Sequence, residues 1–175
     1  MVSYDESFWV VGLCMQRLHF SIVIRAPKEK VWHTMLDDAP YRTWAEAFNS
    51  GSYYKGDWSR GSKMLFLGPN PDGSGEGGMV SRIAENKPFE FISIEHIGII
   101  KDGVEDTTSA EAKKWAPAFE NYTLREIDPP SHEASAKQVA ATEVLVGMDI
   151  EDEHREEFKK MWTEGLQNLK KLAEA

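Results

Sequence analysis

Apolar and polar residues alternate along much of the chain, in short segments separated by turn-forming residues. In the segment 19–25, Phe20, Ile22 and Ile24 fall on one face, and the residues between them fall on the other. Residues two apart in a strand share a face, so this pattern predicts a β-strand. Gly, Pro, Asn and Asp clusters mark the turns. Six further strands are predicted over 52–55, 63–67, 77–85, 89–100, 118–127 and 140–150.

The last segment, 150–175, has a different period. Its apolar residues recur every three or four positions, as on one side of a helix: Phe158, Met161, Trp162, Gly165, Leu166, Leu169 and Leu172. Asp149 is placed to cap the start of this helix. About 23 residues at ~1.5 Å each give a rod of roughly 35 Å. A rod of that length, with Trp and Met on its apolar side, requires a broad partner surface.

Short helices are predicted between the first strand and the hairpins. Pro27 suits a first helical position, and residues 28–36 carry apolar side chains at helical spacing. The segment 37–40, which ends in Pro40, is predicted to break this helix. A second helix is expected over 41–48, with Trp44 and Phe48 on one side. A third short helix is expected within 107–115.

Together these elements predict an α+β fold. Consecutive hairpins form an antiparallel, twisted sheet, and the long terminal helix covers its concave face. Residues 16–175 are expected to form one domain, preceded by an N-terminal extension over 1–15. Its apolar stretch 8–15 follows Asp5 and Glu6, which does not fit a secretory signal. An extra strand, a loose tail and a natural start at Met15 all remain open.

Composition excludes some partner classes. The 175 residues carry a net charge of −9 and no basic run, which argues against nucleic acid as a partner. No apolar run approaches the ~20 residues that span a bilayer, so stable membrane insertion is not expected. Cys14 is the one cysteine, which fits a reducing, cytoplasmic setting. No metal or cofactor is expected, because the five histidines show no ligand spacing.

Certain residues carry a resemblance to a known superfamily. Near the start these are the segment 22–32, a strand followed by Ala–Pro and a helix with Val31 and Trp32, and the segment 41–44. The turn 56–58 with Gly61 follows. In the last helix they are Met161, Trp162, Gly165, Leu166, Asn168, Leu169 and Leu172. Over about residues 18–173 the chain resembles the START-like, helix-grip (SRPBCC or Bet v 1-like) superfamily, in the branch named after the activator of the 90-kDa heat-shock protein ATPase. The resemblance implies about seven strands gripping the final helix, with a cavity between them.

Ten residues are candidates for lining that cavity. The resemblance and the predicted faces select Trp44, Phe48, Phe66, Met79, Ile94, His96, Tyr122, Phe158, Met161 and Trp162. For each apolar or aromatic one, ordinary core packing is the alternative. His96 would hold a ligand's polar group or act as a general base if it faced the cavity, and it would be an ordinary surface residue otherwise. Glu95 and His96 are adjacent on a strand, so they face opposite sides and cannot pair.

Three functions are compatible with this pattern. The first is non-catalytic binding of a small hydrophobic molecule, because an empty apolar void of ~300 Å³ would cost about 7 kcal/mol. The second is a cyclase or hydratase, which requires an ionisable pair facing the cavity. The third is a module that contacts a chaperone, by analogy with the branch name. A homodimer through a sheet edge or the segment 107–118 is also compatible with the sequence.

Overall fold

The structure, a computed structural model, describes residues 15–128, 140–151 and 154–175. In that part of the chain the strands form one antiparallel sheet in the order β1-β8-β7-β5-β4-β3-β2, and β6 pairs with β5. The strands are β1 Met15–Ile24, β2 Tyr53–Gly56, β3 Lys63–Pro69, β4 Glu76–Lys87, β5 Phe91–Lys101, β6 Val104–Asp106, β7 Ala118–Ile127 and β8 Ala141–Glu151.

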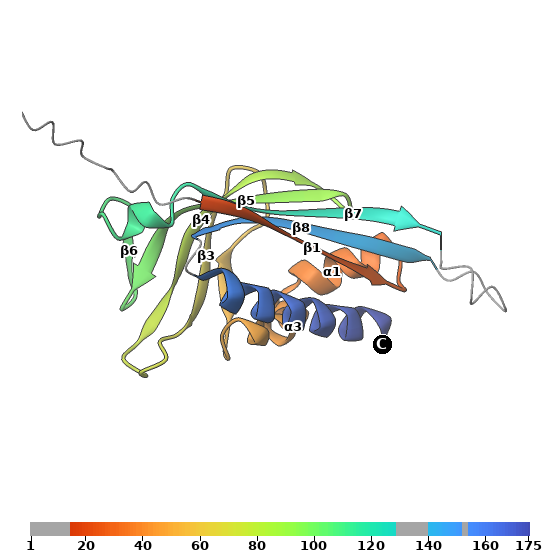
Figure 1. The fold of residues 1–175 in the computed structure, drawn as a ribbon, viewed down its shortest axis with the longest axis horizontal. Helices are drawn as coiled ribbons and strands as arrows, with labels where there is room; N and C mark the ends of the chain where they lie inside the picture. Colours follow the sequence, from red (N-terminus) through yellow and green to blue (C-terminus); the bar gives the residue numbers. More distant parts are fainter. Residues whose placement is uncertain (1–14, 129–139, 152–153) are drawn as a thin grey trace, which may run out of the picture.

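The helices lie together on one face of this sheet. They are α1 Lys28–Leu36, α2 Asp38–Trp44, which continues into the 3₁₀ turn η1 Ala45–Ala47, and α3 Arg155–Glu174. A second 3₁₀ turn, η2 Ala112–Lys114, lies apart from them against β5. Figure 1 shows α3 running beneath β1 and β8 with α1 beside it. This arrangement confirms the predicted α+β, helix-grip architecture.

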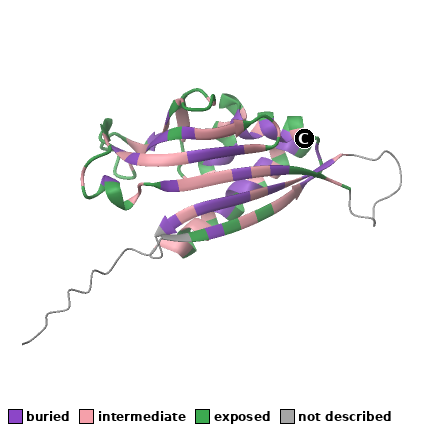
Figure 2. Ribbon diagram, turned by 90° about the horizontal axis from the view of Figure 1, so that it is seen from above, coloured by how far each residue is buried: buried purple, intermediate pink, exposed green. Residues whose placement is uncertain are grey.

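Burial follows the periods seen in the sequence. Figure 2 shows buried and exposed residues alternating along the strands, as expected for a sheet with one face against helices. On α3 the buried side chains recur at helical spacing: Trp162, Gly165, Leu166, Leu169 and Ala173. They pack with the buried side of α1 and with β1, β7 and β8 in one continuous core.

Four predicted boundaries were wrong. The terminal helix starts at Arg155, because β8 continues to Glu151 by pairing with β1. Asp149 therefore lies in a strand opposite Arg17 and does not cap the helix. The first helix does end where predicted, since α1 stops at Leu36 and Asp37 is extended, but the second helix begins at Asp38 and not at 41. Pro40 sits in its first turn, where a missing N–H costs little. The first strand starts at Met15, four residues before the prediction.

Two smaller features also differ from the prediction. The sheet has an eighth strand, β6, over residues for which the sequence analysis predicted no element. Only a 3₁₀ turn forms within 107–115. The predicted extension up to residue 14 and most of the polar loop after β7 lie outside the described residues.

Candidate functional site

A cavity of about 380 Å³ opens between the sheet and the helices. Its walls come from the end of α1, from α2 and η1, from β3, β4, β5, β7 and β8, and from the first half of α3. Most of the lining is apolar, and it is rich in aromatic rings: Tyr41, Trp44, Phe48, Trp58, Phe66, Trp115, Tyr122, Phe158 and Trp162. This is the largely apolar, concave site expected of a protein that binds a small molecule.

Trp162 of α3 packs against three other rings. Its ring is stacked on Phe20 at 5.7 Å between centroids, meets Phe48 edge-on at 4.9 Å and lies 5.9 Å from Tyr122. Only 2% of its surface is exposed. Among the described residues its indole N–H has no hydrogen-bond partner. Trp162 therefore joins α3 to the sheet and to η1 in one aromatic cluster.

Gly165 allows the helix to approach this cluster. A β-carbon at that position would stand 3.0 Å from Cε2 of Phe48 and 3.1 Å from Cζ, closer than carbon atoms normally pack. Glycine in a helix interior costs about 1 kcal/mol relative to alanine. Its presence one turn after Met161 is explained by the contact with Phe48, which forms part of the cavity wall.

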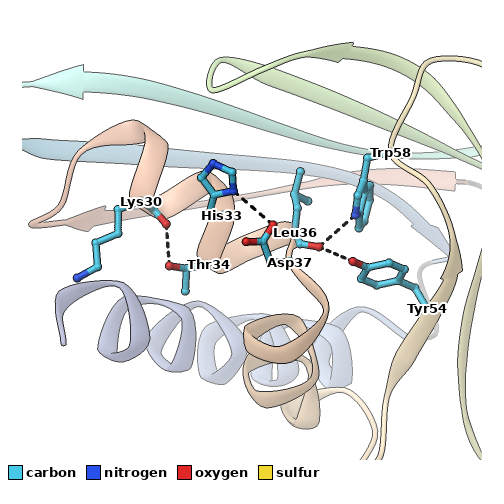
Figure 3. Close-up of polar contacts among 7 residues, drawn as sticks. All are labelled: Lys30, His33, Thr34, Leu36, Asp37, Tyr54 and Trp58. Atoms are coloured by element: carbon cyan, nitrogen blue, oxygen red, sulfur yellow. Dashed lines mark hydrogen bonds and ion pairs between the residues drawn. The ribbon is translucent and has the colours of Figure 1, made fainter.

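The end of α1 holds three aromatic side chains in place. The carbonyl oxygen of Leu36 accepts hydrogen bonds from Tyr54 Oη at 2.7 Å and from Trp58 Nε1 at 3.1 Å (Figure 3). The carbonyl of Met35 accepts one from Trp44 Nε1 at 3.0 Å. The last carbonyls of a helix lack partners within the helix, so these side chains satisfy them. The same bonds fix the orientation of Trp44 and Trp58 in the cavity wall.

A polar cluster, defined as Ser81, His96, Glu120 and Tyr122, interrupts the apolar lining. Ser81 Oγ lies 2.8 Å from His96 Nδ1, and His96 Nε2 lies 3.6 Å from Glu120 Oε2. Tyr122 Oη donates a hydrogen bond to the other carboxylate oxygen of Glu120. His96, Glu120 and Tyr122 line the cavity, while Ser81 is fully buried behind His96. The cluster links β4, β5 and β7 at the cavity wall.

The position of Glu120 favours one tautomer of His96. A carboxylate beside Nε2 favours a proton on that nitrogen, so Nδ1 accepts the hydrogen bond and Ser81 donates it. The distance of 3.6 Å between Nε2 and Oε2 is too long for a hydrogen bond. Both side chains keep some exposure, 13% for His96 and 18% for Glu120. An N–H donor and a carboxylate acceptor are therefore both available to a molecule in the cavity.

Two tyrosines beside Glu120 are held in the neutral form. Burial raises the pKa of Tyr122 well above its ordinary value, and the negative carboxylate of Glu120 raises it further. Burial also raises the pKa of Tyr41, again with a contribution from Glu120. Both hydroxyls thus stay protonated at neutral pH and remain hydrogen-bond donors in the cavity wall.

A second carboxylate in the lining, Asp149, already has partners. Its Oδ1 lies 2.9 Å from Arg17 Nη1, and its Oδ2 accepts a hydrogen bond from the backbone N–H of Phe119 at 3.0 Å. Arg17 itself is not among the lining residues. Asp149 is therefore compensated from outside the cavity, whereas Glu120 has a histidine and a tyrosine hydroxyl as its neighbours.

The structure brings nine of the ten candidate residues to the cavity wall. They are Trp44, Phe48, Phe66, Met79, Ile94, His96, Tyr122, Phe158 and Trp162. Met161 lies outside the lining, because one residue corresponds to about 100° around a helix and Trp162 occupies the inward direction. His96 faces the cavity and not the surface. Glu95 faces the other side, where it pairs with Arg82.

Sequence analysis did not single out Glu120 as the partner of His96. Glu120 lies two residues before Tyr122 on β7 and therefore shares its face. The prediction that Tyr122 faces the cavity already implied the same for Glu120.

No metal site is visible in the described ranges. Nowhere in them do three or more His, Cys, Asp or Glu side chains gather in a way that could hold a metal ion. The helices of the same ranges also lack the combination of length and apolar character needed to cross a bilayer.

Comparison with solved structures identifies the fold. CV1439 from Chromobacterium violaceum matches with a TM-score of 0.59 and 22% identity, over 91% of this chain and 97% of that one. ChR145 from Cytophaga hutchinsonii matches with a TM-score of 0.61 and 18% identity, over 91% and 94%. The chain has the helix-grip fold. No family model matches the sequence, and no curated protein matches it.

One further match comes from a biosynthetic locus. DynU16, a protein of the dynemicin biosynthetic locus, matches with a TM-score of 0.59 and 13% identity. The match covers 91% of this chain and 47% of DynU16. At this level of identity the likeness concerns the fold alone.

Proposed function

We propose that this protein binds a small, largely apolar molecule in the cavity between the sheet and α3. The observation that carries the proposal is the aromatic lining around an interior volume of about 380 Å³, within the range of ligand sites. Water in such a space would find few polar partners, so an apolar guest that displaces it gains free energy. The polar cluster supplies the few directional contacts that orient a ligand.

A titration with a neutral probe tests this proposal. We expect 2-naphthalenemethanol to bind with 1:1 stoichiometry by isothermal titration calorimetry, because its ring matches the apolar wall and its hydroxyl reaches the polar cluster. Met79→Trp enlarges a half-buried side chain in the wall and should weaken binding at least tenfold. Leu65→Trp places the same side chain on the other face of the same strand pair and should leave binding unchanged. Equal effects of the two variants would contradict binding in the cavity.

A second function, acid–base catalysis in the same cavity, is favoured by the His96–Glu120 pair. The carboxylate of Glu120 would accept a proton from a substrate, and the N–H of His96 would hold the anion that develops. The base-sensitive probe 5-nitrobenzisoxazole tests this idea, since loss of its C3 proton breaks its N–O bond and releases a coloured cyanophenolate. Catalysis predicts a rate at least tenfold lower in Glu120→Gln. Equal rates in the wild-type protein and in Glu120→Gln would reject catalysis by Glu120.

The remaining expectations stay proposals. Kinship with the branch of the heat-shock ATPase activator is supported by the segments 22–32 and 41–44 and by the Trp162 helix. Contact with a chaperone and formation of a homodimer are compatible with the fold. A cytoplasmic location is supported by the single cysteine of the chain.

A further inference from the structure

The charges that face the cavity are almost all of one sign. Among the described lining residues there is no Lys or Arg, and the ionisable carboxylates are Glu120 and Asp149. Asp149 is balanced by Arg17 from outside the lining. His96 is the one basic lining residue, and its Nε2 lies 3.6 Å from the Glu120 carboxylate. The Glu120 carboxylate therefore lies in a mostly apolar lining that contains no Lys or Arg to pair with it.

This charge makes the cavity unfavourable for anions. A ligand carboxylate placed near the polar cluster would meet the Glu120 carboxylate with no Lys or Arg of the lining between them, and like charges repel strongly where little water screens them. A cationic head has two sources of attraction. Glu120 supplies the opposite charge, and the aromatic rings of the lining, such as Tyr41, Trp44 and Phe66, supply cation–π attraction where a ring face meets the cation.

The unused hydrogen-bond acceptor positions of Glu120 also favour a ligand head that donates a hydrogen bond. A carboxylate has about four acceptor positions, and Tyr122 Oη supplies the one hydrogen bond to Glu120 within the described residues. Oε2 of Glu120 lies 3.6 Å from His96 Nε2, too far for a hydrogen bond, so this oxygen keeps acceptor capacity for a ligand donor group that approaches from the cavity. An ammonium or hydroxyl group donates into that position, whereas a carboxylate has no proton to donate.

We propose that the ligand of this cavity carries a non-anionic, hydrogen-bond-donating head, above all an amine, and that Glu120 selects it against carboxylate ligands such as fatty acids. This inference rests on the proposed binding function and names the chemical class of the ligand. It assigns to Glu120 the choice of head group, and to the aromatic wall the binding of the apolar body.

Three probes with one ring system test the inference. They are 2-naphthylmethylamine, 2-naphthalenemethanol and naphthalene-2-carboxylate, titrated into the protein by calorimetry at pH 7.5, where the amine is cationic and the acid anionic. We expect the amine to bind at least tenfold more tightly than the carboxylate, with the alcohol between them. Equal or tighter binding of the carboxylate would overturn the inference.

Two matched variants test whether Glu120 causes the preference for the amine over the carboxylate. Glu120→Gln removes the charge but keeps an oxygen that accepts from Tyr122, so the preference for the amine should fall to within about threefold while the alcohol still binds. Glu95→Gln removes one charge from the opposite face of the sheet and should leave the preference unchanged. An amine preference that survives Glu120→Gln would refute the role of Glu120. Failure of all three probes to bind the wild-type protein would instead refute the binding function on which the inference rests.

Discussion

Replacing Trp162 with alanine is expected to lower the free energy of unfolding by about 3–5 kcal/mol. The indole is almost fully buried and contacts the rings of Phe20, Phe48 and Tyr122, so its removal takes away the contacts that join α3 to the sheet. The void would merge with the existing cavity, and the surrounding rings are held from several elements and cannot all collapse into it. Urea unfolding followed by circular dichroism measures the loss.

Two control variants separate burial of Trp162 from other effects. Trp162→Phe keeps an aromatic ring and removes the unpaired indole N–H, so it should cost clearly less than alanine. Val104→Ala truncates a side chain that is 66% exposed and should change stability by less than about 0.5 kcal/mol. A loss below about 1.5 kcal/mol in Trp162→Ala would show that the indole borders open space and is not packed core.

Gly78→Ala is expected to destabilise the protein by about 3 kcal/mol or more. Gly78 lies on β4 beside the cavity with φ +152°, and a β-carbon there would stand 1.9 Å from the carbonyl oxygen of Phe66. That atom belongs to the backbone of β3, so the two strands would have to separate to relieve the clash. The same unfolding experiment gives the value.

Gly103→Ala provides the matched comparison. Gly103 also has a positive φ, +75°, but a β-carbon there would find no atom within 4 Å. The variant therefore pays only the conformational cost of a left-handed alanine, about 1–2 kcal/mol. Similar losses in the two variants would mean that conformational strain, and not the clash with Phe66, determines the effect at Gly78.

The fold could be predicted from the sequence because apolar residues follow two clear periods, one of two residues along the strands and one of three to four along the terminal helix. Alternation located β7 at 118–127, and helical spacing located the buried side of α3, since both patterns report which side of an element leaves water. The end of β8 was harder to predict. Asp149 suits a helix cap by type, but its ion pair with Arg17 on β1 is a contact between residues far apart in the sequence. No local pattern contains that information.

The candidate site could be predicted only in part, because the inward face of a strand depends on its register. β4 has register shifts between Val80 and Ser81 and between Ile83 and Glu85, so counting alternate residues along it fails. His96 faces the cavity opposite Ser81, and Glu120 reaches it from the neighbouring strand. The polar cluster draws its four residues from three strands, so it depends on strand pairing, which the sequence alone did not determine.

The location of a bound guest is tested most directly by the methyl signals of methionine. In ¹³C-methyl-methionine NMR spectra, assigned through single Met→Leu variants, Met35, Met79 and Met148 report on the cavity wall, whereas Met161 lies outside it. Titration with 2-naphthalenemethanol should shift the three wall signals together and saturably, and should leave that of Met161 almost unchanged. Saturable binding that moves Met161 and leaves Met35, Met79 and Met148 in place would contradict a ligand held between the sheet and α3.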